Sequence, residues 1–163
     1  MNAITKLTSI VNDQCVQTEL KLVEICKTVD RAVPHANRVS LWKFSDDRSR
    51  IKCLYVLDPE NGSAQGQVLT HKDYPVYFEH ILNNRVIVAS DARQHYVTKY
   101  FGDAYFVPLN IFSTLDFIVH VDHQPIGIIC CESVGQQVNW DKRDKVAIKR
   151  IANVMSKYVA ERL

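Results

Sequence analysis

The first candidates for chemistry in this chain are its five cysteines: Cys15, Cys26, Cys53, Cys130 and Cys131. The last two are adjacent, in the apolar run IGIICCES (126–133). Neighbouring side chains of a strand point to opposite faces, so this pair is a poor metal site and a poor disulfide. Structural zinc sites need thiols separated by two to four residues, a spacing that does not occur here. We therefore interpret the pair as buried strand residues on opposite faces, and assign Cys131 to a ligand-binding side.

Asp116, in the run STLDFIVHV (113–121), is the second candidate, because aspartate is disfavoured in strands. Its face of the strand also carries Thr114, Ile118 and His120, whereas the opposite face is entirely apolar. Such a mixed face suits contact with a ligand. Alternatively, Asp116 hydrogen-bonds loop backbone and holds a lid over the pocket. The two interpretations are compatible, and both stay open.

A group of aromatic residues is expected on the same side: Tyr74, Tyr77, Phe78, Tyr96, Tyr100, Tyr105 and Phe106. Aromatic walls with a few polar groups suit a small planar or apolar ligand. The alternative is that these side chains pack the pocket shut. The predicted ligand-binding set is Asp73, Tyr74, Phe78, Tyr105, Thr114, Asp116, Ile118 and Cys131.

The six histidines do not form an H-x-x-x-H pair, so a metal site would have to be assembled from distant positions such as His71, His95 and His120. We predict no metal site and no catalytic residues.

Hydrophobic periodicity predicts the elements that must position these residues. Helices are expected at 2–33, 73–84 and 140–161, strands at 38–44, 50–57, 65–70 and 85–90, and a hairpin of strands at 113–121 and 125–133. Residues 91–112 are the least regular segment. This order favours an α+β layer architecture, with terminal helices on one face of an antiparallel sheet and a pocket on the loop-rich face.

Composition narrows the class of protein. A length of 163 residues suits one domain, 1–163, and a net charge of +2 gives no sign of a nucleic-acid or membrane partner. No apolar run reaches the length of a membrane span. An odd number of cysteines without a secretory signal indicates reduced thiols, and hence a cytoplasmic protein.

Several segments together resemble a GAF domain of the kind found in bacterial sensor kinases and cyclic-dinucleotide signalling proteins. They are DYPVYF (73–78), NNRVIVASDA (83–92), YFVPLNIFSTLD (105–116), QPIGIICCES (124–133) and NWD (139–141). The resemblance implies a sheet of five or six antiparallel strands. It also implies terminal helices packed together on one face, and a small-molecule pocket closed by loops on the other.

Within that family, the resemblance extends to phytochromes in the DYP element (73–75), but the bilin-tethering cysteine that precedes their Tyr-Leu pair is absent from GDA (102–104). The signature N-K-F-D-E of cyclic-nucleotide-binding members is also missing. Free methionine-R-sulfoxide reductases carry cysteines in the pocket loops, whereas 58–64 and 91–112 contain none.

The function implied is ligand sensing in bacterial signal transduction, without catalysis and with an unknown cofactor. The alternatives are a dimerisation scaffold with a self-filled pocket and a thiol-dependent reductase. We expect a homodimer through the terminal helices, with a kinase or cyclase as the effector. Apolar positions expected at the free ends of these helices are Ile4, Leu7, Ile10, Val11, Tyr158, Val159 and Leu163.

Overall fold

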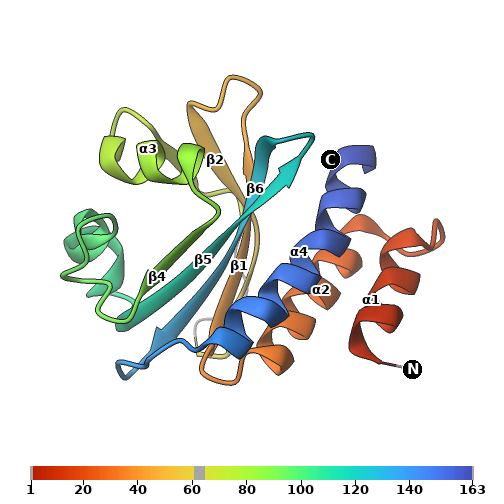
Figure 1. Cartoon of the computed structure of the whole chain (residues 1–163), viewed down its shortest axis with the longest axis horizontal. Coiled ribbons are helices and arrows are strands. Elements are labelled where there is room, and N and C mark those ends of the chain that lie inside the picture. Colours follow the sequence, from red (N-terminus) through yellow and green to blue (C-terminus); the bar gives the residue numbers. More distant parts are fainter. Residues whose placement is uncertain (1, 61–64, 163) are drawn as a thin grey trace.

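A six-stranded antiparallel sheet forms the centre of the molecule (Figure 1). The structure is a computed structural model that describes residues 2–60 and 65–162, without the side chains of 159–162. The strands are β1 (Arg38–Phe44), β2 (Arg50–Leu57), β3 (Val68–Thr70), β4 (Val86–Ala89), β5 (Ile111–Val121) and β6 (Gln124–Val134), in the spatial order β3-β2-β1-β6-β5-β4. The predicted α+β architecture is confirmed.

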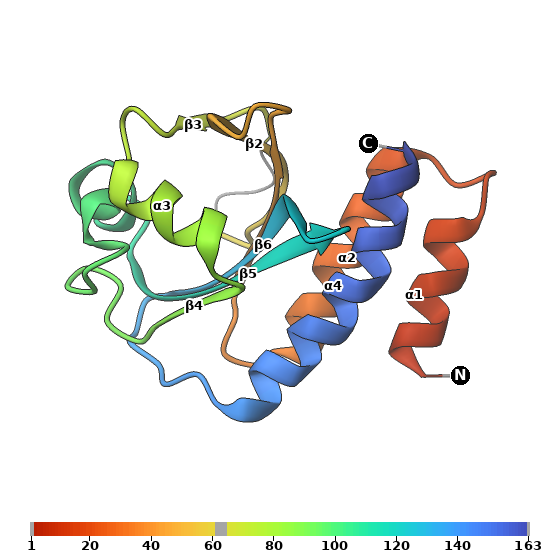
Figure 2. The same cartoon turned by 45° about the horizontal axis from the view of Figure 1, so that its top comes forward.

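Two layers cover the sheet differently (Figure 2). One face packs against the helices α1 (Ala3–Asn12), α2 (Thr18–Ala32) and α4 (Lys142–Arg162). The other face is covered by α3 (Pro75–Asn83) and by two short turns, η1 (Lys99–Phe101) and η2 (Gly102–Phe106). Each layer has its own apolar core, so the sheet separates two environments within one chain.

The predicted single helix over 2–33 is wrong, because α1 ends at Asn12 and α2 begins at Thr18. The Asn2 side chain accepts a hydrogen bond from the Thr5 amide and caps α1. Between the helices, the Asp13 carboxylate accepts a hydrogen bond from the Cys15 amide at 2.8 Å. Asp competes in this way with helical backbone bonding, which gives the break its physical cause.

The break lets α1 fold back onto α2 and α4 (Figures 1 and 2). Leu7 and Val11 of α1 and Tyr158 of α4 are therefore buried within a single chain, each at most 3% exposed. The expectation that these residues form exposed stripes at the helix ends is wrong. Val159 and Leu163, which we placed in the same stripes, have side chains outside the described residues.

The starts of α3 and α4 are held in different ways. Asp73 does not cap α3: Tyr74 occupies the N-cap position without a side-chain hydrogen bond. Asn139 does not cap α4. Instead, the Asp141 carboxylate accepts from the Asp144 amide at 3.0 Å and the Asp144 carboxylate accepts from the Asp141 amide at 2.8 Å. This reciprocal pair fixes the start of α4.

Candidate functional site

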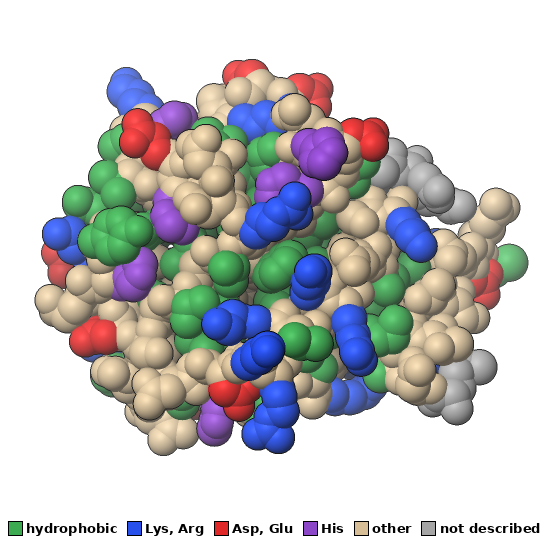
Figure 3. All heavy atoms as spheres, viewed as in Figure 1, with side chains coloured by type: hydrophobic (Ala, Val, Ile, Leu, Met, Phe, Trp, Pro, Cys, Tyr) green, Lys and Arg blue, Asp and Glu red, His purple; other side chains and the backbone are tan. Residues whose placement is uncertain are grey.

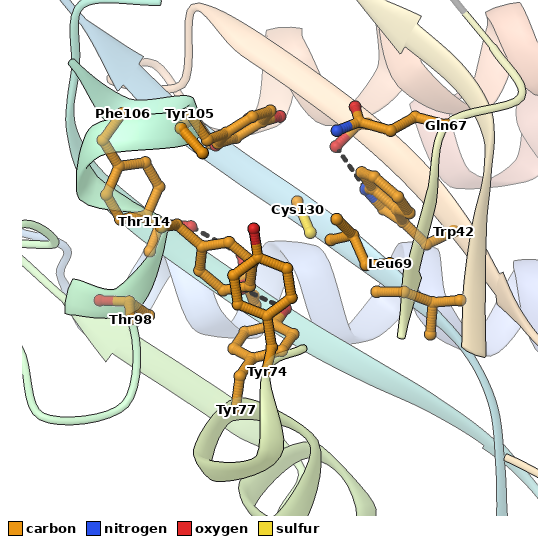
Figure 4. Close-up of a pocket in the computed structure, with 16 residues that line it drawn as sticks. Trp42, Gln67, Leu69, Tyr74, Tyr77, Thr98, Tyr105, Phe106, Thr114 and Cys130 are labelled. Carbon is orange, nitrogen blue, oxygen red and sulfur yellow. Dashed lines mark hydrogen bonds between the residues drawn. The ribbon is translucent and has the colours of Figure 1, made fainter. Parts of the chain in front are cut away.

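A small cavity lies between the sheet and the layer formed by α3, η1 and η2 (Figure 4). Its free volume is about 60 Å³. One water needs ~10–15 Å³ on this scale, so there is room for several waters or a small organic molecule. The described residues that line it are Ser40, Trp42, Ile51, Gln67, Leu69, Tyr74, Tyr77, Thr98, Phe101, Ala104, Tyr105, Phe106, Thr114, Asp116, Cys130 and Glu132.

Strand alternation produces a polar floor for this cavity. Thr114 and Asp116 are alternate residues of β5, and Cys130 and Glu132 are alternate residues of β6. The register of the sheet pairs Asp116 with Cys130 and Thr114 with Glu132. Directly paired residues share a face, so all four point into the same space. Ser40, which pairs with Cys130 from β1, extends this floor.

Asp116 lies at the centre of the first hydrogen-bond network. Its carboxyl group accepts from the Tyr77 hydroxyl at 2.9 Å and from the Thr114 hydroxyl at 2.7 Å, and Cys130 lies opposite it on β6. Burial raises the pKa of Asp116, and these donors only partly oppose that rise. The bond to Tyr77 ties α3 to the floor of the cavity.

Arg38 holds a second network at the adjoining end of the floor. Its guanidinium donates to the carboxylates of Asp58, at 3.0 Å, and Glu132, and to the Tyr105 hydroxyl. Burial raises the pKa of Glu132 to about 7, although Arg38 acts in the opposite direction. Burial is the largest influence on the pKa of Arg38 and lowers it, but Glu132 and Tyr105 together outweigh burial and raise that pKa. The two side chains therefore form a buried ion pair that holds β1 against β6.

Aromatic rings make the walls. Tyr74 stacks on Phe101 with ring centres 4.3 Å apart, and Tyr77 meets the same ring edge-on at 4.8 Å. Tyr105 and Phe106 approach from η2, and Trp42 faces them from β1 (Figure 4). The Trp42 indole N–H donates to the Ser40 hydroxyl at 2.9 Å. The cavity is thus an aromatic enclosure with acidic groups at its base.

The buried thiols are poor nucleophiles. Cys130, on the floor, has its pKa raised well above the ordinary value by burial and then by Asp116. Cys53 lies in the same layer, where burial raises its pKa to about 11. Thiolate is the reactive form of cysteine, and these environments disfavour it.

Four of the eight predicted site residues line the cavity: Tyr74, Tyr105, Thr114 and Asp116. Ile118 and Phe78 lie on the expected side but are buried in the core next to the cavity.

The structure contradicts the other two assignments. Asp73 is exposed and does not line the cavity. Cys131 is buried in the core on the helix side, and Cys130 takes the position expected for it. The cause is an irregularity in the β5–β6 hairpin: Val121 pairs with Gln124, but Val119 pairs with Gly127. If the pairing next to the turn continued along both strands without a break, Cys131 would face the ligand side. Instead, one extra residue in β6 shifts the pairing by one, so Cys130 faces that side.

Sequence reasoning missed the role of Glu132. It also missed Ser40 and Trp42 of β1, and Arg38 behind them. The alternation of β6 could have revealed Glu132 once Cys130 was placed. Arg38 has no local signal, because its partner Glu132 is 94 residues away in the sequence.

The helix-side surface has a different character. Figure 3 shows Lys and Arg side chains gathered over α4, where Lys142, Arg143, Lys149, Arg150 and Lys157 are exposed. Across the described ranges 2–60 and 65–162, no helix combines the length and apolar character needed to cross a membrane. In the same ranges, no three His, Cys, Asp or Glu side chains converge as a metal site requires.

Comparisons with known proteins agree on the fold. No family model and no curated protein matches the sequence. Among solved structures, the GAF domain of an Acinetobacter phosphoenolpyruvate-protein phosphotransferase superposes with a TM-score of 0.74 at 12% identity, covering 98% of this chain and 91% of that one. The phycocyanobilin-bound GAF domain of a cyanobacterial phytochrome gives 0.74 at 14% identity, covering 99% and 98%.

An enzyme has a similar fold as well. The free methionine-R-sulfoxide reductase of Neisseria meningitidis superposes with a TM-score of 0.73 at 13% identity, covering 97% of this chain and 86% of that one. At these identities the likeness concerns the fold and not the activity. The chain therefore has the fold of a GAF domain.

Proposed function

We propose that this chain is a regulatory sensor domain of bacterial cytoplasmic signal transduction, which binds a small molecule without catalysis. The observation that carries the proposal is the cavity, which has walls of aromatic rings and a floor of buried polar groups. Concave sites of this kind, mostly apolar with a few placed polar groups, are typical of small-molecule binding. The fold supports the proposal, since a phytochrome GAF domain with bound phycocyanobilin shares it.

The signal would pass through the sheet. Ligand binding would reorder the segments 58–64 and 91–112, of which residues 61–64 lie outside the described part. Tyr77 would couple α3 to Asp116, whose neighbour Leu115 packs in the helix-side core. A ligand that favours one arrangement of this layer would shift how α2 and α4 pack, and an attached kinase or cyclase would read that shift.

A dimerisation scaffold with a self-filled pocket is the second candidate. The stacking of Tyr74 on Phe101 favours it, because both rings line the cavity and pack against each other there. Dimerisation through the terminal helices remains part of this proposal. Its interface would have to use partly exposed residues such as Ile4 and Ile10, since Leu7 and Val11 are already covered.

A thiol-dependent reductase is the weakest candidate. Catalysis of that kind needs an accessible thiolate that attacks sulfur and a second thiol that resolves the product. Cys130 is buried, and its pKa is raised. We expect no turnover of free methionine sulfoxide with a thiol donor. Turnover that disappears in Cys130→Ser would restore the enzyme interpretation.

The test of ligand sensing is native mass spectrometry of protein purified from its own cells. We expect a co-purified small molecule that is lost in Ala104→Trp, because Ala104 lines the cavity. Asp103→Trp is the matched control, since Asp103 is exposed and does not line the cavity. A molecule retained equally by both variants would place the binding elsewhere. No bound molecule from any growth condition would favour the scaffold.

A further inference from the structure

The ionisable groups around the cavity carry charge of one sign. Among its described lining residues are two carboxylic acids, Asp116 and Glu132, and no lysine, arginine or histidine. Both acids are buried, at 4% and 3% exposure. A buried carboxylate is costly unless a cation or a set of hydrogen bonds compensates it. If the protein does not supply the compensating cation, a ligand that carries a positive charge can supply it.

Arg38 does not compensate both acids. Its guanidinium is shared between Glu132 and Asp58, so one positive charge already faces two carboxylates. Asp116 lies beyond this pair. It accepts hydrogen bonds from the neutral hydroxyls of Tyr77 and Thr114, and its cross-strand neighbour is the thiol of Cys130. When both lining acids are ionised, the site holds an excess of negative charge.

The aromatic rings around the cavity suit a positive charge as well. Aromatic faces attract cations, more strongly where water is excluded. The Tyr105 ring already holds a cation of the chain itself: the guanidinium carbon of Arg38 lies 5.2 Å from its ring centre. Tyr74, Tyr77 and Phe101 continue this aromatic surface around the cavity.

We propose that the cavity is selective for a small organic cation, an alkylammonium group that lies against the aromatic rings and pairs with Asp116. The inference rests on the proposed function, since it names the ligand class of the same site. The free volume of about 60 Å³ limits the bound part to a few heavy atoms. Anions are excluded, because they would meet the carboxyl groups without a lining cation to receive them.

The proposal has a consequence for pH. The groups that face Asp116 are Tyr77, Thr114, Cys130 and Glu132, with a weaker influence from His80 on α3. Burial keeps the pKa of both lining acids raised in the empty site, to about 7 for Glu132. A bound cation favours their ionised forms, so binding releases protons. Glu132 ionises around pH 7, so the affinity for a cation should increase as the pH rises through that value.

The experiment is a titration of the full chain with three probes of similar shape, followed by calorimetry and by the proton NMR shift of the probe's methyl groups. The probes are tetramethylammonium chloride, neutral tert-butanol and sodium 2,2-dimethylpropanoate. We expect tetramethylammonium to bind with an upfield shift from the rings and with higher affinity at pH 8 than at pH 6. The other two should bind at least about tenfold more weakly, because they leave the acids unpaired.

Asp116→Asn is the decisive variant, because it keeps the shape of the side chain and removes its charge. It should weaken tetramethylammonium binding at least about tenfold. Asp103→Asn makes the same change in net charge at an exposed position outside the cavity and should leave binding within about twofold. If Asp116→Asn does not fold, the pH dependence measured on the unmodified chain carries the test.

Each outcome separates this inference from the proposed function. Equal binding of the neutral or anionic probe, or affinity that does not change with pH, would overturn cation selectivity and leave ligand sensing intact. No binding of tetramethylammonium to the folded protein would also overturn it. A co-purified anionic or neutral molecule, lost in Ala104→Trp, would show that sensing holds and that the ligand class is wrong.

Discussion

The two faces of the sheet are built from the same strands, yet they bury different kinds of groups. Leu115 and Cys131 face the helices and pack among aliphatic side chains, whereas their chain neighbours Asp116 and Cys130 face the cavity. The helix side is held by packing, and the pocket side is held by a charged pair and hydrogen bonds. The comparison teaches that one face of a sheet can stabilise the fold by apolar packing while the other face places polar groups in a binding cavity.

The largest effect should come from the charged pair on the pocket side. Arg38→Met leaves the Glu132 carboxylate buried without its cation, and it should lower the free energy of unfolding by about 3–5 kcal/mol at pH 8. Urea denaturation measures this. The exposed Arg50→Met is the control and should change little. A loss below about 1 kcal/mol would mean that the pair contributes no more than surface ion pairs do.

On the helix side, the comparable loss should come from packing. Leu115 is fully buried, so Leu115→Ala removes apolar contacts and leaves a cavity. We expect the free energy of unfolding to fall by about 2–5 kcal/mol, with no dependence on pH. Leu20→Ala, at a position 54% exposed on α2, is the control and should have little effect. A pH-dependent loss in Leu115→Ala would contradict the separation of the two faces.

The pH dependence of stability should belong to the pocket side. The pKa of Glu132 is raised by burial from 4.5 to about 7, so its contribution is complete below pH 4.5 and is lost as the pH rises through about 7. The stability of the unmodified chain relative to Glu132→Gln should thus fall between pH 4.5 and 7. One unit of pKa corresponds to ~1.4 kcal/mol, so the rise from 4.5 to about 7 makes the fall at most about 3.5 kcal/mol.

Denaturation curves of both chains at several pH values measure this difference. The histidines His95 and His120, whose pKa values burial lowers, cancel in the comparison because both chains carry them. A difference that stays constant over this range would show that Glu132 does not titrate there.

The smallest effect concerns the start of α4 on the helix side. Asp141→Ala removes the acceptor for the Asp144 amide and should destabilise the fold by about 0.5–2 kcal/mol. Asp141→Ser keeps a capping oxygen and should recover most of the loss. If the serine variant is as unstable as the alanine variant, the effect does not come from capping.

Much of this arrangement follows from local patterns in the sequence. The alternation in 113–121 predicts that Leu115 and Asp116 face opposite layers, and the structure confirms it. β1 and β2 have the predicted bounds because apolar alternation and the polar turn between them are both local signals.

The remaining features depend on pairing between distant segments. The extra residue in the β5–β6 hairpin decides which of Cys130 and Cys131 meets the cavity, and no pattern within β6 shows it. Arg38 meets Glu132 only because β1 pairs with β6. The packing of α1 back onto α4 likewise depends on contacts between segments that are distant in the sequence.

The placement of the thiols allows the rate of local opening to be measured for each layer of the protein. All five cysteines lie in the described residues, where Cys15 is exposed and the other four are buried. Cys26 and Cys131 lie in the helix-side core, and Cys53 and Cys130 lie in the pocket-side core. An alkylating reagent modifies Cys15 at once and reaches each buried pair only when its own layer opens. Pulsed alkylation read by peptide mass spectrometry would thus time the two layers separately in an unaltered protein.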